Sequence, residues 1–527
     1  MSIFGVDSKN LSKQQKIKRL REVSQKAEAD LEHVDVVVSA AANFTVGSAL
    51  LEQGKVLKAL EYLQIAANKQ SQNPQYLAVL AKANLMLRNE AKARAFAESA
   101  MSLDQELSPE IAYTLGYVFT RLGNHGVALG LFEKAVELEL ENKDYLDNLA
   151  QSYVFLGKNE AAINLYDTVL RLDAGSGKAF LGLADLEKPT LEKNRLGQLK
   201  DAMSQSTSLR EKIRIGFALG KTYEALGQWD NAFKSFDQAN SDFMAKLKFN
   251  VADDERLIDT FKSVYLNDLK QQNSNIKDEV LFVVGIPRTG TTLVDRILSA
   301  HSKVVSAGEL QSMPLAVKLA SATNSKIVLD EDTIIKAGRA DIEAVGRAYL
   351  DNARIHEGAN HGIVFTDKLP LNFMYAGFIL KALPNAKIVC LRREPMDTVW
   401  SNYKHLFGGG ARYHTYSYDL ISIARFYIAY KQITDFWAQE FPERFMVLDY
   451  ENLVADQRLY TQQLLSHCGL DWEEGCLDFH SSTKAVATPS ASQVRKPLYS
   501  GSIGKWTNYA EQLEEVRAFF EADDVIG

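Results

Sequence analysis

Small and apolar residues recur in the first half of the chain about every 34 positions. Turn residues mark this period at Gly54, Arg88, Gly123 and Gly157, and again two periods later at Gly227. An alanine follows each turn by five positions, at Ala59, Ala93, Ala128, Ala162 and Ala232. Larger apolar residues stand nine positions after three of the turns, at Phe132, Tyr166 and Phe236. Small side chains let two helices approach closely and larger ones fill the gap to the next pair, so the pattern predicts stacked helix pairs.

Together these columns resemble the tetratricopeptide repeat family, over about residues 40–176 and 213–246. Residues 177–212 fit the pattern poorly, although their number suits one degenerate repeat. The resemblance implies an all-α superhelix that binds a protein or peptide on its concave face. A helical scaffold that binds no ligand explains the pattern equally well.

The pattern changes after about residue 249. Four short apolar runs then alternate with helical stretches, at residues 280–285, 363–366, 387–391 and 444–449. Strands of this length between helices predict an α/β domain with a parallel sheet. We therefore expect an N-terminal helix over residues 1–39, repeats over 40–246, a connector over 247–275 and the α/β domain over 276–527.

Composition mainly excludes other classes of protein. The 527 residues are 46% hydrophobic and 24% charged, as in folded proteins. Lys and Arg number 60 against 67 Asp and Glu, so the net charge of −7 gives no reason to expect a nucleic-acid partner. The three cysteines fit no metal-binding spacing, and no apolar leader or membrane-length apolar stretch is present. These features predict a cytoplasmic protein without a membrane partner.

The first apolar run of the α/β domain leads into the loop IPRTGTT and then into an amphipathic helix. Backbone N–H groups and the positive end of the helix dipole make such a loop an anion site. Gly285, Gly290 and Thr292 match the phosphate loop G-x-x-x-x-G-K-[ST], but Thr291 replaces its lysine. That lysine neutralises the β- and γ-phosphates, so its loss disfavours a nucleoside triphosphate with Mg²⁺. Arg288 supplies a cation within the loop.

A strand followed by PRTGTT resembles the 5′-phosphosulfate loop of sulfotransferases, which implies a P-loop-like fold for this domain. The resemblance also implies 3′-phosphoadenosine 5′-phosphosulfate as the donor, adenosine 3′,5′-bisphosphate as the product, and no metal. It assigns contacts with the 5′-phosphate and the sulfuryl group to five loop residues, Arg288, Thr289, Gly290, Thr291 and Thr292. A turn that only caps a helix is the alternative.

A donor with a 3′-phosphate needs a second basic site away from its reacting end. The apolar run 387–391 ends in two arginines, and Arg393 with Ser401 resembles the sulfotransferase 3′-phosphate motif in its R-x₇-S spacing. An arginine fork can hold phosphate oxygens in a bidentate manner. Arg392 competes for this role, although the spacing favours Arg393. Two arginines that solvate the end of a strand are the alternative.

A third basic segment, residues 488–509, is rich in hydroxyl groups. It resembles the C-terminal segment that closes over the nucleotide in tyrosylprotein and related repeat-containing sulfotransferases. The resemblance implies Ser490 and Lys505 as further donor contacts. A solvated basic loop packed by Trp506 is the alternative.

Sulfuryl transfer needs a base for the acceptor proton and cations around the sulfuryl oxygens. Glu309 lies 21 residues after Arg288, the spacing of the general base in the tyrosylprotein branch, and the resemblance gives it that role. Other branches use histidine, and His301 is a weaker candidate. Lys368 matches the lysine that stabilises the sulfate in the family. Asp367 before it resembles either a Walker B acid or a partner that positions Lys368.

The sequence thus predicts a sulfotransferase that acts on an acceptor hydroxyl, on a protein or peptide bound by the repeats. A Mg²⁺-dependent nucleotide kinase or hydrolase, and a non-catalytic repeat scaffold that retains a nucleotide, remain alternatives. The sequence does not identify the acceptor. The Gly- and aromatic-rich segment 408–418 predicts a mobile loop on the acceptor side, with an ordinary surface connector as the alternative.

Overall fold

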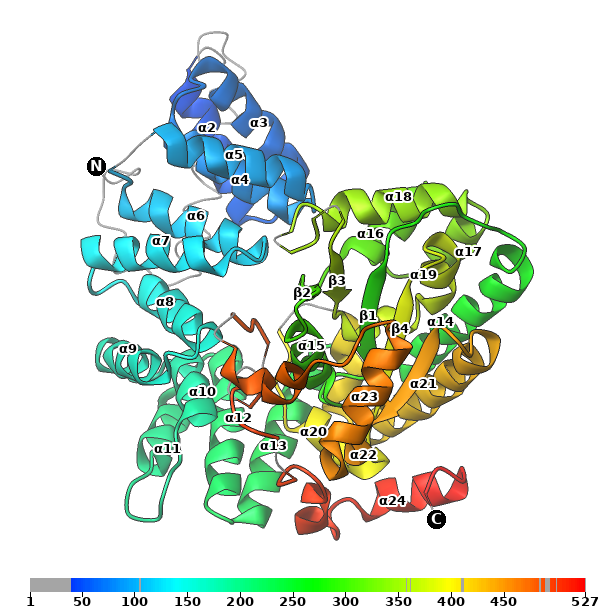
Figure 1. Cartoon of the computed structure of the whole chain (residues 1–527). Helices are drawn as coiled ribbons and strands as arrows, with labels where there is room; N and C mark the ends of the chain where they lie inside the picture. The colour runs from blue at the N-terminus through cyan, green and yellow to red at the C-terminus, as the bar shows by residue number, and fades with distance from the viewer. Residues whose placement is uncertain are drawn as a thin grey trace. The chain divides into compact units, whose positions relative to one another are not determined.

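The computed structural model describes residues 39–103, 106–356, 358–360, 362–408, 412–482, 485–488, 493–498 and 500–526. The predicted N-terminal helix over 1–39 therefore lies almost entirely outside the described residues. The chain divides into two compact units, Met1–Tyr145 and Leu146–Gly527 (Figure 1). This division falls inside the repeats rather than at their end.

The first unit consists of antiparallel helix pairs. Its helices are α2 (Ala40–Glu52), α3 (Val56–Lys69), α4 (Pro74–Met86), α5 (Glu90–Leu103), α6 (Pro109–Arg121) and α7 (His125–Leu138). A Cβ at Gly116 would lie 2.8 Å from the Phe132 ring, so the small and large columns do meet. Gly54 and Gly123 have left-handed φ values of 77° and 79°, and Arg88 holds the same turn at 60°. The turn column is therefore set by backbone conformation, which glycine adopts without a steric cost.

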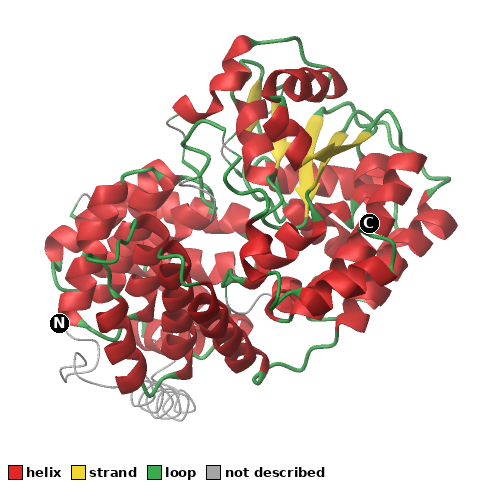
Figure 2. Cartoon of the chain, turned by 90° about the horizontal axis from the view of Figure 1, so that it is seen from below, coloured by secondary structure: helices red, strands yellow, loops and turns green. Residues whose placement is uncertain are grey.

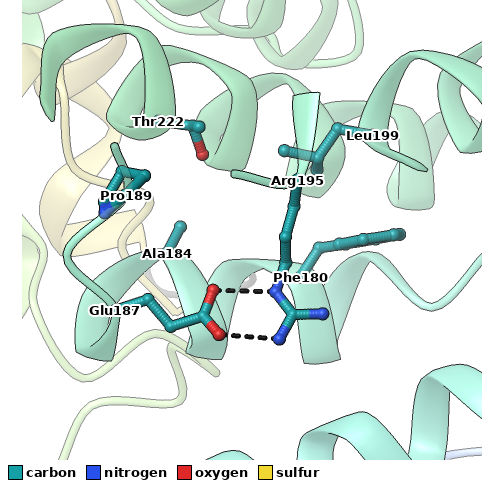
Figure 3. Close-up of a pocket in the computed structure, with 7 residues that line it drawn as sticks. All are labelled: Phe180, Ala184, Glu187, Pro189, Arg195, Leu199 and Thr222. Carbon is teal, nitrogen blue, oxygen red and sulfur yellow. Dashed lines mark hydrogen bonds and ion pairs between the residues drawn. The ribbon is translucent and has the colours of Figure 1, made fainter. Parts of the chain in front are cut away.

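The second unit begins with the remaining repeat helices. These are α8 (Lys143–Phe155, which starts just before the boundary), α9 (Asn159–Leu172), α10 (Gly177–Leu186), α11 (Leu196–Gln205), α12 (Leu209–Ala225) and α13 (Trp229–Met244). The poorly matching stretch contains the two shortest of them, with 10 residues each in α10 and α11. Figure 3 shows a small hollow among these helices, where Arg195 donates to both carboxylate oxygens of Glu187 at 2.7 and 2.6 Å. This ion pair closes the irregular turn between α10 and α11.

The segment expected as a connector forms helix α14 (Val251–Val264), which continues into the short π-helix η3 (Tyr265–Leu269). Leu257, Ile258 and Phe261 are buried, and Phe261 packs edge-on against Tyr375 with ring centroids 4.7 Å apart. This segment is therefore part of the core of the second unit.

A five-stranded parallel sheet forms the centre of the second unit, in the order β2-β3-β1-β4-β5. The strands are β1 (Val280–Gly285), β2 (Val304–Ser306), β3 (Val364–Asp367), β4 (Lys387–Arg392) and β5 (Phe445–Asp449). Alternate residues of β1 face two cores: Phe282 and Val284 lie in one, Leu281 and Val283 in the other. Helices flank the strands (Figure 2). The sheet and the helical repeats confirm the predicted fold class.

The other helical elements surround the sheet. They are α15 (Thr291–Ser299), α16 (Ser312–Ala320), α17 (Glu331–Gly338), α18 (Ile342–Ala353), η4 (Pro370–Phe373), α19 (Ala376–Ala382), α20 (Pro395–Tyr403), η5 (Arg412–Tyr418), α21 (Leu420–Glu440), α22 (Tyr450–Ala455), α23 (Gln457–His467), η6 (Glu474–Ser481), η7 (Lys505–Tyr509) and α24 (Glu514–Ala522). Among the described residues, none of the helices has the length and apolarity that a bilayer crossing requires.

The strand order reverses between β1 and β4. From β1 the chain goes to β2 at one edge of the sheet, whereas from β4 it goes to β5 at the other edge. Ligands of open parallel sheets bind at such a reversal. Gly285 pairs with Leu391 in register, so the loop after β1 and the arginines after β4 leave the sheet side by side.

Candidate functional site

The loop between β1 and α15 has a conformation that its glycines permit. Gly285 and Gly290 have φ values of 150° and 105°, and Arg288 is left-handed at 71°. A Cβ at Gly285 would lie 2.7 Å from the Leu391 carbonyl oxygen, and one at Gly290 would lie 2.7 Å from the Tyr450 ring. A left-handed residue other than glycine costs about 1–2 kcal/mol. Such strain is concentrated at functional sites, which agrees with an anion-binding role for the bend.

Side chains fix this loop from within and from α20. Thr289 Oγ1 donates to the Ile286 carbonyl at 2.8 Å, and Asn402 Nδ2 donates to the Pro287 carbonyl at 2.9 Å. Gly290 occupies the N-cap position of α15, and no side chain of the described residues caps that helix. Its first N–H groups lack the usual side-chain acceptor, so a bound anion can take that place. Thr291 and Thr292 are buried in the first turn.

Arg393 lies against the same bend. Its guanidinium donates to the Arg288 carbonyl at 3.1 Å and to the Ser502 carbonyl at 2.5 Å, and it lies 3.6 Å from the Asp397 carboxylate. The side chain is only 8% exposed, and its Nε has no hydrogen-bond partner among the described residues. A buried donor without an acceptor is costly. An anionic ligand beside the loop would satisfy it.

The neighbouring arginine points elsewhere. Arg392 donates to Thr434 Oγ1 at 3.0 Å and to Asp435 Oδ1 at 2.6 Å, and both partners lie on α21. Burial lowers the pKa of Arg392, but its bond with Asp435 and the charges of nearby groups together raise it above the ordinary value. Arg392 is thus engaged in a structural pair, and of the two arginines it is Arg393 that contacts the loop. Ser401 lies on α20, next to the Asn402 that contacts this loop.

Glu309 and Lys368 form one ion pair. The Lys368 ammonium donates to Glu309 Oε1, and its backbone N–H donates to the Gly308 carbonyl at 2.8 Å. Lys368 is 2% exposed whereas Glu309 is 42% exposed, so the carboxylate is the solvent-facing member of the pair. The residues predicted as base and as cation therefore meet at the ends of β2 and β3.

A buried carboxyl that the sequence did not single out supports this pair. Asp295 of α15 accepts hydrogen bonds from Ser306 Oγ at 2.9 Å and from Thr366 Oγ1. Ser306 Oγ in turn accepts from the Gly308 N–H at 3.3 Å. Burial raises the pKa of Asp295. This network joins the phosphate-loop helix to the strand ends that lead to Glu309 and Lys368.

Asp367 contacts the opposite side of β3. Its Oδ2 accepts from the Tyr349 hydroxyl at 3.2 Å and from Asn372 Nδ2 at 3.4 Å. Burial raises its pKa to about 8. Through these bonds Asp367 joins β3 to α18 and η4, and its role as the partner that positions Lys368 stays a prediction. Within the described ranges, no group of three His, Cys, Asp or Glu side chains could hold a metal ion.

The C-terminal segment crosses the loop. Thr488 Oγ1 lies 3.3 Å from Thr292 Oγ1, and Arg288 donates to Gln493 Oε1 at 3.4 Å. Ser490, predicted as a donor contact, lies outside the described residues. Described residues of the segment thus contact the phosphate loop, and its closing role stays a prediction.

A second part of this segment is fixed to α20. Asp397 accepts from the Gly504 N–H at 2.6 Å and from the Trp506 N–H at 3.2 Å. The Tyr450 hydroxyl lies 2.7 Å from Ser502 Oγ. Lys505, the first residue of η7, is exposed. It stays a predicted donor contact beside this anchored turn.

The histidine that the sequence considered is engaged elsewhere. His301 Nε2 lies 3.0 Å from the Asp471 carbonyl, and its Nδ1 accepts from the Lys303 N–H at 3.1 Å. Both ring nitrogens therefore support a turn, as expected for a residue that caps or packs.

Two other histidines lie close to the charged groups of the site. Burial lowers the pKa of His405, and the nearby charge of Arg288 lowers it further. Burial lowers the pKa of His414 to about 4, against an opposing effect of Glu309. The His414 ring stacks on Phe407 at 4.6 Å. Sequence reasoning missed both, although His414 lies in the segment 408–418 that was expected as a loop on the acceptor side.

That segment is packed where it is described. Tyr416 stacks on Phe426 with ring centroids 3.8 Å apart, and Tyr418 stacks on Phe243 at 4.0 Å. Tyr416, Ser417 and Tyr418 are buried. The prediction of a mobile loop is therefore wrong for these three residues, because aromatic packing fixes them.

Residues 281–474 match a family model described as the sulfotransferase family, and residues 148–187 match a tetratricopeptide-repeat model. An uncharacterised protein of Aquifex aeolicus is 30% identical over 329 residues, which are 60% of this chain and 43% of that protein. A protein-tyrosine sulfotransferase of Drosophila melanogaster is 24% identical over 266 residues, 46% of this chain and 50% of its own. The chain thus spans about half the length of these relatives.

Solved structures give weaker likenesses. The sulfotransferase domain from the curacin biosynthetic pathway aligns with 46% of this chain and 99% of its own length, at 17% identity and a TM-score of 0.30. A tetratricopeptide-repeat protein with an unusual peptide-binding site aligns with 41% of this chain and 98% of its own, at 15% identity and a TM-score of 0.27.

Proposed function

We propose that this chain, a tetratricopeptide-repeat protein with a sulfotransferase-family domain, transfers a sulfuryl group from 3′-phosphoadenosine 5′-phosphosulfate to an acceptor hydroxyl. One observation carries the choice of donor: the Arg393 guanidinium contacts the bend of the phosphate loop while its Nε has no acceptor among the described residues. Two anion-binding groups at one reversal of strand order suit a nucleotide with phosphate at both ends.

The loop and the first turn of α15 would hold the 5′ end. Arg288 would supply one cation, Thr291 and Thr292 their hydroxyl groups, and the start of the helix its uncapped N–H groups, while the Thr289 hydroxyl holds the shape of the loop. Arg393 and Ser401 would hold the 3′-phosphate, with Ser490 and Lys505 as further contacts from the C-terminal segment. The family match over residues 281–474 supports this assignment, since it includes the loop, Arg393 and Ser401.

Glu309 would take the proton of the acceptor hydroxyl. The acceptor oxygen forms a bond to sulfur while the bond from sulfur to the bridging oxygen breaks, and the electron pair leaves on adenosine 3′,5′-bisphosphate. Lys368 would stabilise the negative charge that develops on that leaving oxygen. Because Lys368 is paired with Glu309 before the donor binds, the incoming anion competes for the ammonium and frees the carboxylate to act as a base.

The acceptor belongs to a protein or peptide in our proposal. The repeats support this, because stacked helix pairs of this kind present an extended surface for peptide segments. The two protein-tyrosine sulfotransferases of Drosophila melanogaster and Danio rerio, each 24% identical to this chain, act on protein tyrosine by their names. A tyrosine hydroxyl is therefore the first acceptor to test.

Calorimetric titration with adenosine 3′,5′-bisphosphate in the presence of a chelator tests the donor assignment. We expect binding without any divalent cation. Mg²⁺-dependent binding of ATP, with no binding of the bisphosphate, would instead support the kinase or hydrolase alternative. Bisphosphate binding without sulfuryl transfer to any acceptor in a broad panel, unaffected by Glu309→Gln, would support a scaffold that retains a nucleotide.

A further inference from the structure

One repeat residue contacts the elements that carry the second anion site. Glu224 lies in the last turn of α12 and is 23% exposed. Its carboxylate accepts from Trp400 Nε1 at 3.4 Å, from the Tyr509 hydroxyl at 3.1 Å and from Lys404 Nζ at 3.0 and 2.9 Å. Trp400 belongs to α20, Lys404 follows that helix directly, and Tyr509 ends η7.

These partners flank the residues assigned to the 3′-phosphate. Ser401 stands between Trp400 and Lys404, and α20 begins two residues after Arg393. The turn η7 begins at Lys505. A shift of α20 relative to η7 would therefore change the spacing between Ser401 and Lys505, two of the groups assigned to this phosphate.

Aromatic packing holds the hydrogen-bond donors of Trp400 and Tyr509 next to Glu224. The Trp400 and Tyr509 rings are fully buried with centroids 3.9 Å apart, and Trp400 also packs on Phe236 of α13 at 5.8 Å. Glu224 is the carboxylate at the edge of this aromatic cluster. It accepts hydrogen bonds from donors that would otherwise be buried without a partner, and losing such a partner is costly.

The charges around Lys404 also favour a carboxylate at residue 224. Burial lowers the pKa of Lys404, and Arg288 and Lys221 lower it further, while Glu224 raises it. Glu224 is thus the counter-charge that lets an ammonium stay beside the phosphate loop. Without Glu224, Lys404 would lose this counter-charge against Arg288 and Lys221. The repulsion would then push α20 away from the phosphate loop.

We propose that Glu224 is a positioning residue for the 3′-phosphate subsite, so that the last repeat forms part of the donor site. The inference rests on the proposed function, because it takes Arg393 and Ser401 as the phosphate ligands. Asp397 anchors the start of η7 and Glu224 anchors its end. Removing one anchor loosens the subsite and leaves the other in place.

Paired titrations separate positioning from general stability. Adenosine 3′,5′-bisphosphate and adenosine 5′-monophosphate share the 5′ end, so the ratio of their affinities isolates the 3′-phosphate. We expect Glu224→Gln to reduce this ratio about tenfold while the affinity for the monophosphate stays unchanged. Glu211→Gln is the matched control, because Glu211 lies on the same helix and its carboxylate accepts from Arg214 and from the Gly177 N–H, both within the repeats.

Tyr509→Phe gives a second variant that keeps the ring packing and removes only the hydroxyl. It should reduce the ratio by a smaller factor in the same direction. An unchanged ratio in Glu224→Gln, or an equal loss of affinity for both nucleotides, would overturn the positioning role. A wild-type protein that does not prefer the 3′-phosphorylated nucleotide would overturn the proposed function, and this inference with it.

Discussion

Arg393 is the residue on which the donor assignment depends most. Its side chain is buried and contacts the Arg288 carbonyl of the phosphate loop, whereas Arg392 bonds Asp435 of α21. Two adjacent arginines thus have different partners because successive residues leave a strand in opposite directions. Sequence spacing favoured Arg393, and the contact with the loop supports that choice.

Arg393→Ala should weaken binding of adenosine 3′,5′-bisphosphate by about 10- to 100-fold, because a charge-assisted hydrogen bond contributes about 1.5–3 kcal/mol. Arg393→Lys should recover only part of this, since an ammonium cannot form the two parallel bonds of a guanidinium. Calorimetric titration measures both variants. Equal affinity of Arg393→Ala and wild type would remove Arg393 from the site.

Asp367 predicts how stability depends on pH. Its folded pKa of about 8 lies above the ordinary value of 3.8, so the folded protein holds a proton that the unfolded chain releases. The stabilisation is complete below pH 3.8 and is lost as the pH rises towards about 8. Between pH 3.8 and about 8, the urea concentration at the unfolding midpoint should fall less steeply with rising pH in Asp367→Asn than in wild type. Parallel curves for the two proteins would show that Asp367 is ionised when folded.

At the scale of elements, most of the correctly predicted helices and strands came from periodic patterns in the sequence. The repeat columns and the apolar runs correspond to helix pairs and to strands β1, β3, β4 and β5, because burial imposes periods that a sequence displays. The three-residue strand β2 was missed because it is too short to show a pattern. The buried helix α14 was read as a connector because its polar residues outnumber its apolar ones.

The loop after β1 gives a prediction at this scale. Gly285→Ala should reduce nucleotide binding at least tenfold, because its Cβ would lie 2.7 Å from the Leu391 carbonyl and its φ of 150° is costly for alanine, by about 1–3 kcal/mol. Gly197→Ala is the control, since a Cβ there meets nothing within 4 Å. Unfolding curves and titrations on both variants check this. Full nucleotide binding by Gly285→Ala would show that the loop tolerates another conformation.

At the scale of the whole chain, the later repeats are joined to the α/β domain within one compact unit. Asn240 Nδ2 donates to the Tyr403 carbonyl at 2.9 Å, and the Tyr403 hydroxyl donates to Asp237 at 2.7 Å. The Val486 N–H of the C-terminal segment donates to the Phe155 carbonyl at 2.9 Å. None of these contacts could be predicted from one sequence, because they join residues more than 160 positions apart.

Sites that depend on such contacts were missed for the same reason. Glu224, His405 and His414 belong to no recognisable motif. Only the folded chain brings Glu224 near α20, His405 near Arg288 and His414 near Glu309. Asp295 lies on the motif helix, but its hydrogen bonds with Ser306 and Thr366 depend on where β2 and β3 end. Motif residues near one strand end were predictable, whereas their supports were not.

Transfer of a labelled sulfuryl group tests the account most directly. The protein would be incubated with labelled donor, a chelator and cell lysate, and mass spectrometry would search for the added sulfuryl mass on peptides and on small molecules. We predict label on peptide hydroxyls, lost about 100-fold or more in Glu309→Gln and Lys368→Met and retained in Lys318→Met, whose lysine bonds Ile327 and Thr333 instead. No transfer under any condition, together with Mg²⁺-dependent hydrolysis of ATP, would contradict the account.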